Sequence, residues 1–61
     1  MFKKDENLKI RDDIDYSQIG GLSSEMVLRF SRVRPSTIGE ASRISGVTPA
    51  AITALLGYIK K

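Results

Sequence analysis

The sequence predicts an all-α fold, a small bundle of three to four short helices that contains a helix-turn-helix-like pair. The first observation is a set of helix-start signals, such as Thr37 three residues before Glu40, which is the pattern of a capping box. Thr48 followed by Pro49 is a second start, because threonine caps helices and proline is favoured in the first turn. The second observation is that apolar residues recur at helical spacing after these signals. With 61 residues, the chain is long enough for one small domain with a thin core.

We treat residues 1–61 as a single domain in which residues 20–61 form the helical core and residues 1–19 are loosely held. Residues 1–10 are mostly polar, and an isolated helix of that length is marginal in water. An N-terminal helix is therefore optional and is expected to fray. Residues 11–16 contain three aspartates and are expected to form an extended turn.

The first helix is expected over residues 23–33. Ser23 is its N-cap, and Glu25 lies in the first turn, where the helix dipole favours a negative charge. Pro35 ends the helix, because a residue that precedes proline, here Arg34, is turned away from helical geometry.

The helix-turn-helix-like pair follows, with helices expected over residues 38–44 and 49–60. Ser45-Gly46 ends the first of them, since glycine adopts the left-handed conformation that closes a helix. The second presents a regular apolar stripe and is expected to be interior. The predicted core consists of Leu22, Met26, Val27, Phe30, Val33, Ile38, Ala41, Ile44, Val47, Ile52, Leu55, Leu56 and Ile59.

Composition limits the possible functions. The chain has no cysteine and no histidine, so a disulfide framework or a histidine-based metal site is excluded, and we expect no metal. Its longest apolar run is too short to span a bilayer, and the first residues lead us to expect no signal peptide, so no membrane partner is expected. These features fit a reducing cytoplasm.

No residue pattern indicates catalysis. The aspartates at positions 12, 13 and 15 lack a histidine and the spacing of a calcium loop. Gly20-Gly21 lacks the strand, lysine and hydroxyl residue of a phosphate-binding loop. By itself the chain is expected to be a binding or docking module and not an enzyme.

Nearly the whole chain resembles the C-terminal helical domain of the tRNA uridine 5-carboxymethylaminomethyl modification enzymes, the MnmG or GidA family. The family carries a block of the form RP-x-TIG-x-ASRISGVTPAAI, which corresponds here to Arg34-Pro35, Thr37 to Gly39 and Ala41 to Ile52. The sequence departs from the family at three positions, where it has Arg11, Glu40 and Gly57.

The resemblance implies a role in tRNA modification. Proteins of this family depend on FAD, use NADH, act with the GTPase MnmE and modify the wobble uridine of tRNA. Their C-terminal helical domain is associated with MnmE and with tRNA. The flavin site belongs to another domain of the family, so this fragment is expected to bind neither FAD nor NADH. Its expected partners are the GTPase MnmE, tRNA and the rest of the MnmG chain.

Two alternatives remain open. TIGEASRISGVT, residues 37–48, is also similar to the helix-turn-helix of MerR-type transcription regulators, which bind DNA. A recognition helix needs polar side chains that reach base edges, whereas residues 49–56 are mostly Ala, Ile and Leu. The other alternative is a purely structural cap on a larger enzyme.

The expected contact residues are basic. Residues 29–61 hold six basic side chains and one acidic side chain, whereas residues 1–28 hold four basic and six acidic ones. An anionic partner is therefore expected at the C-terminal half. Among the basic residues, Arg43 is the first choice for a contact with tRNA. The alternative for Arg43 is an ion pair with Glu40, one turn earlier. The proposed tRNA- or partner-binding residues are Arg29, Arg32, Arg34, Arg43, Lys60 and Lys61.

Overall fold

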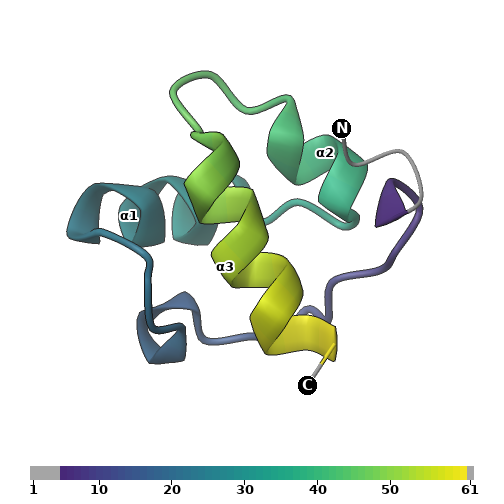
Figure 1. Cartoon of the computed structure of the whole chain (residues 1–61), viewed down its shortest axis with the longest axis horizontal. Coiled ribbons are helices and arrows are strands. Elements are labelled where there is room, and N and C mark those ends of the chain that lie inside the picture. Colours follow the sequence, from purple (N-terminus) through teal and green to yellow (C-terminus); the bar gives the residue numbers. More distant parts are fainter. Residues whose placement is uncertain (1–4, 61) are drawn as a thin grey trace.

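A computed structural model describes residues 5–60 of the chain. Its helices are the 3-10 helix η2 (Tyr16–Gln18) and the α-helices α1 (Ser24–Val33), α2 (Ile38–Ser42) and α3 (Pro49–Lys60). α3 crosses the middle of the molecule, with α1 on one side and α2 on the other (Figure 1). Residues 5–60 contain an isolated β-bridge between Lys9 and Thr37 and no strand. The predicted all-α bundle is confirmed.

Local capping explains where α1 begins and ends. The Ser23 hydroxyl accepts a hydrogen bond from the Met26 N–H at 3.3 Å, as expected for an N-cap. At the other end Arg34 has a φ of 54° and its N–H donates to the Phe30 carbonyl at 2.8 Å. This left-handed conformation is uncommon for a residue other than glycine. Pro35 disfavours a right-handed helical conformation at Arg34, and the left-handed one keeps the hydrogen bond to Phe30 that closes the helix.

The pair α2 and α3 has the predicted caps. The Thr37 hydroxyl accepts from the Glu40 N–H, and the Thr48 hydroxyl accepts from the Ala51 N–H, each at 3.2 Å. α2 ends at Ser42 and not at residue 44, because the chain tightens after Arg43 into short-range hydrogen bonds. Gly46 has the left-handed conformation expected of it, with a φ of 87°.

The core draws on the N-terminal third of the chain, which the sequence did not predict. Tyr16 is 1% exposed and its ring stacks on Phe30 at a centroid distance of 5.2 Å. One predicted core position is wrong, since Val33, the last residue of α1, is exposed. Six others are half-buried and pack against the core: Leu22, Val27, Ile44, Val47, Leu56 and Ile59. The buried apolar residues are Ile10, Tyr16, Ile19, Met26, Phe30, Ile38, Ala41, Ala51, Ile52 and Leu55.

Residues 5–10, which we call the strap, cross the start of α2. The Leu8 carbonyl accepts from the Ile38 N–H at 3.0 Å and the Glu6 carbonyl accepts from the Gly39 N–H at 2.9 Å. The strap therefore supplies acceptors for helix N–H groups that have no partner inside α2. Within it Asp5 has 3-10 helical conformation, and turns and a β-bridge follow. The remaining part of the optional helix, residues 1–4, lies outside the described residues. That residues 1–19 are loosely held in solution stays a prediction.

Candidate functional site

Arg29 joins α1 to the turn between α2 and α3. Its guanidinium donates to the Ser45 carbonyl at 3.0 Å and to the Glu25 carboxylate at 3.1 Å. It also lies against Gly46, where an added Cβ would be 2.8 Å from the guanidinium carbon. Arg29 was proposed as a contact for tRNA or a partner protein, but the structure places its side chain between α1 and the turn after α2, with contacts that stabilise the fold.

Arg34 also bonds to main-chain carbonyls. Its guanidinium donates to the carbonyls of Asp12 and Ile14, at 3.0 and 3.3 Å. The side chain thereby ties the end of α1 to the loop that precedes η2. Hydrogen bonds to main-chain carbonyls use donors that a phosphate would need.

Arg43 and Lys60 contact the strap. The Arg43 guanidinium pairs with the Glu6 carboxylate, and the Lys60 ammonium lies 3.4 Å from a carboxylate oxygen of Asp5. The expected alternative for Arg43, a pair with Glu40, is not formed. Glu40 instead accepts from the N–H and the hydroxyl of Ser36, and these hydrogen bonds lower its pKa.

Arg32 is different from these four residues. Among residues 5–60 it forms no hydrogen bond or ion pair. It lies on the outer face of α1 beside Leu28, which is 64% exposed, and Val33, which is 53% exposed. Lys61, the sixth proposed contact, lies outside the described residues. The structure therefore places the five described members of the proposed set in different surroundings.

The outer face of α1 borders a shallow hollow of about 280 Å³. Sequence reasoning gave Leu28 no role and assigned Val33 to the core. The sequence feature that could have indicated this face is the spacing of Leu28 and Arg32. They are four residues apart, which places their side chains next to each other on the helix surface. The hollow is lined by Glu25, Leu28, Arg29, Arg32, Val33 and Ile44.

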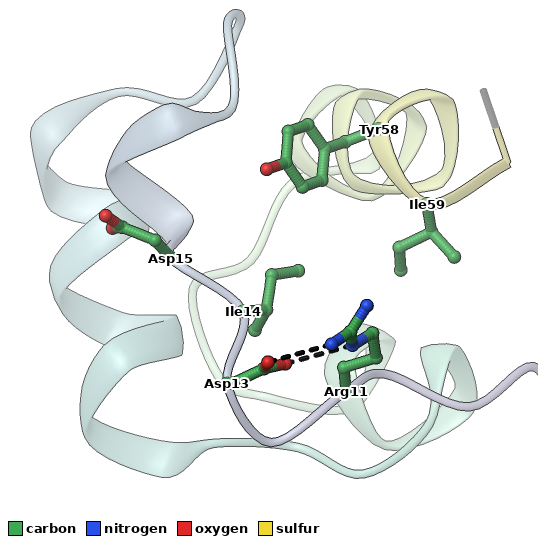
Figure 2. Close-up of a pocket in the computed structure, with 6 residues that line it drawn as sticks. All are labelled: Arg11, Asp13, Ile14, Asp15, Tyr58 and Ile59. Carbon is green, nitrogen blue, oxygen red and sulfur yellow. Dashed lines mark hydrogen bonds and ion pairs between the residues drawn. The ribbon is translucent and has the colours of Figure 1, made fainter.

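A second hollow, of about 440 Å³, lies between α3 and the loop before η2. In Figure 2, Tyr58 and Ile59 of α3 lie across from Ile14 and Arg11, while the Asp15 side chain points away. Neither carboxylate of this hollow is unpaired. Asp13 binds the Arg11 guanidinium through both oxygens, at 3.0 and 2.9 Å.

The other carboxylate that lines this hollow, Asp15, also has hydrogen-bond partners. Asp15 accepts from the hydroxyl and the N–H of Ser17, at 2.6 and 3.1 Å, and these bonds lower its pKa. A general base must have a pKa near the working pH, and a carboxyl with a lowered pKa is a poor base. Within residues 5–60, no three acidic, histidine or cysteine side chains are grouped so that they could hold a metal ion. In the same range no helix is long and apolar enough to cross a membrane.

The geometry of α3 bears on the DNA-binding alternative. Ile52 and Leu55 are 2% and 0% exposed, as predicted for an interior helix. Thr53 is exposed, but its hydroxyl donates to the Pro49 carbonyl at 3.1 Å. A helix with this surface offers few groups that could read base edges.

Comparison with known proteins identifies the family. The family model of the tRNA modifying enzyme MnmG/GidA C-terminal helical bundle matches residues 1–61. The tRNA uridine 5-carboxymethylaminomethyl modification enzyme MnmG of Sulfurihydrogenibium sp. (strain YO3AOP1) is 55% identical over 56 residues, which cover 92% of this chain and 9% of that protein. The enzyme of the same name from Caldicellulosiruptor saccharolyticus is 53% identical over 61 residues, which cover 100% of this chain and 10% of that protein.

A solved structure agrees with these relatives. GidA of Aquifex aeolicus, in its form II crystal, is similar with a TM-score of 0.92 and 53% sequence identity, over 98% of this chain and 10% of that one. The chain thus spans about a tenth of the length of the proteins that it matches. These matches give no support to the MerR-type alternative.

Proposed function

The chain belongs to the family of C-terminal helical bundles of the tRNA modifying enzyme MnmG/GidA, and on that basis we propose that it is a docking module of a parent enzyme that contacts the GTPase MnmE, tRNA or both. In this proposal the parent acts in the cytoplasm on the wobble uridine of tRNA, with FAD and NADH. The bundle has no catalytic role of its own. In this proposal the cofactor sites lie in the rest of the parent chain.

The outer face of α1 is the observation that carries the proposal. Leu28 and Val33 are the exposed large apolar side chains of the described region, and they flank Arg32, whose guanidinium has no partner there. Exposed apolar groups beside an arginine are typical of protein interfaces, in which arginine is enriched and apolar area is removed from water. This face therefore favours the GTPase as its partner.

RNA would be contacted elsewhere. The face of α1 has no aromatic side chain on which a base could stack, since Phe30 is fully buried and Tyr16 nearly so. Contact with tRNA would then depend on phosphate binding by basic residues outside α1. Arg43 and Lys60 are the described candidates whose partners are side-chain carboxylates.

The proposal is tested by equilibrium binding of the full-length parent enzyme to MnmE and to tRNA. The double variant Leu28→Ser/Arg32→Glu should weaken MnmE binding at least about tenfold, because it removes apolar contact and reverses a charge at the same face. Its affinity for tRNA should change much less. Ala50→Ser, a change at an exposed position of α3, is the control and should leave both affinities unchanged.

A purely structural cap gives a different result. In that case the α1 variant, together with Arg43→Gln and Lys60→Gln, would leave both affinities unchanged and would at most lower the melting temperature of the parent. That outcome would contradict the docking proposal.

A further inference from the structure

The strap brings two acidic side chains onto two basic ones. Asp5 and Glu6 are neighbours in sequence, and their carboxylates pair with Lys60 at the end of α3 and with Arg43 just after α2. Two cations from distant parts of the sequence therefore meet the same short segment. No other adjacent pair of acidic residues within residues 5–60 is paired in this way with cations of two different helical regions.

We infer that Arg43 and Lys60 form a phosphate-binding site for an RNA strand, and that Asp5 and Glu6 occupy this site as internal anions when RNA is absent. The inference rests on the tRNA contact in the proposed function. It adds the location of the site and a means of regulation, because RNA phosphates and strap carboxylates compete for the same two cations.

The exposure of these groups makes an exchange of anions feasible. The Arg43 side chain is 66% exposed and that of Lys60 is 57% exposed, so both can be reached from solvent. Exposed ion pairs contribute little to folding stability and are weakened by salt. A phosphate can therefore replace a carboxylate at small cost, and a polynucleotide gains further from the release of its counterions.

The main chain of the strap is held independently of its carboxylates. The carbonyls of Glu6 and Leu8 accept from α2, and the Ile10 N–H donates to the Ser36 carbonyl at 2.8 Å. Ile10 is also buried. The carboxylates can leave Arg43 and Lys60 while these contacts remain, so the exchange does not require the domain to unfold.

The other described arginines of the C-terminal half lack this combination. Arg29 and Arg34 donate to main-chain carbonyls, and a phosphate that displaced those bonds would leave carbonyls without partners. Arg32 has no internal anion to be displaced. Glu40, one turn before Arg43, is engaged by Ser36. The competition is therefore specific to Arg43 and Lys60.

The test is a tRNA titration of the full-length parent enzyme at several salt concentrations. Glu6→Gln removes the competing charge and keeps the main chain, so it should raise tRNA affinity about two- to fivefold at low salt, which corresponds to the strength of a surface ion pair. Asp5→Asn should act in the same direction. Arg43→Gln should lower the affinity and reduce the slope of log affinity against log salt by somewhat less than one. In the double variant Glu6→Gln/Arg43→Gln the gain should disappear.

Glu25→Gln is the matched control, because it removes one negative charge from another surface ion pair, the one with Arg29 on α1. An equal gain in affinity from Glu25→Gln would show a general effect of charge and would overturn the inference.

A loss of tRNA affinity in Arg43→Gln without a gain in Glu6→Gln would also overturn the inference, although the proposed tRNA contact would stand. Unchanged affinity in all of these variants, with MnmE binding still sensitive to the α1 variant, would remove the RNA site and leave the docking proposal intact. Melting temperatures of each variant exclude misfolding as the cause.

Discussion

The Tyr16 hydroxyl is a buried polar group of the core that lacks a hydrogen-bond partner among the described residues. The ring is stacked on Phe30, and burial raises the pKa of the hydroxyl. An unsatisfied buried hydroxyl costs free energy relative to an apolar group of the same shape. The ring is therefore required for packing, whereas the hydroxyl is not.

Tyr16→Phe is expected to leave the domain as stable or to stabilise it by up to about 1 kcal/mol, because the ring contacts remain and the unpaired hydroxyl is lost. Chemical denaturation of both forms measures the difference. The variant should also lose less stability as the pH rises past about 10, since the folded state disfavours the ionised tyrosine. Destabilisation by more than about 1 kcal/mol would show that the hydroxyl has a partner.

Glu40 makes the stability depend on acidic pH. The N–H and hydroxyl of Ser36 hold its pKa below the ordinary 4.5. A carboxyl whose pKa is lower in the folded chain stabilises the fold above its unfolded pKa, and this contribution is lost as the pH falls through the folded pKa. The melting temperature should therefore drop on acidification below about pH 4.5, and Glu40→Gln should show a smaller drop. Identical pH profiles would contradict this role of Glu40.

At the scale of elements, the contact between the strap and α2 depends on a glycine. A Cβ on Gly39 would lie 2.5 Å from the Glu6 Cγ and 2.9 Å from the Glu6 carbonyl oxygen, which are impossible separations. Gly57, in the last turns of α3, has no atom within 4 Å of the corresponding position. Replacing these two helical glycines with alanine should therefore have opposite effects on the stability of the domain.

Gly39→Ala should destabilise the domain by pushing the strap away from α2, with a cost typical of overpacking, about 1–3 kcal/mol. Gly57→Ala should stabilise it by about 0.5–1 kcal/mol, because alanine is the better helix former and meets nothing. Both are measured by thermal or chemical unfolding. Equal effects of the two substitutions would show that the strap does not pack closely on α2.

The helices themselves could be predicted because their signals are local. The hydroxyls of Ser23, Thr37 and Thr48 cap the three α-helices as expected, and each lies within a few residues of the N–H that it accepts from. The end of α2 was placed two residues too late, since nothing local indicates that the chain tightens there. Helix ends are the least certain part of such predictions.

The contacts of the strap could not be predicted from the sequence. Glu6 and Arg43 are 37 residues apart, and the expected partner of Arg43 was its neighbour Glu40. The burial of Ile10 likewise depends on the approach of residues 36–39 to the strap. Such contacts depend on the path of the whole chain, whereas spacing and capping describe short segments.

At the scale of the whole molecule, one thin core holds all elements together. Leu55 is fully buried within it, while Leu56 is only partly buried. Leu55→Ala is expected to cost about 2–5 kcal/mol, which is comparable to the total stability of a small domain. Leu56→Ala should cost clearly less. Circular dichroism and denaturation of the 61-residue chain decide this, and equal losses would contradict the observed core.

The most direct measurement of the docking role compares the full-length parent enzyme with a parent that lacks this domain. Affinities for MnmE and for tRNA are measured for both forms, and the melting temperature of the remaining chain shows that it is folded. We predict that the shortened enzyme binds at least one of the two partners more than tenfold more weakly, and that adding back the separate domain does not restore affinity to the full value, since the two parts are then no longer linked. Unchanged affinity for both partners in a folded, shortened enzyme would contradict the docking role.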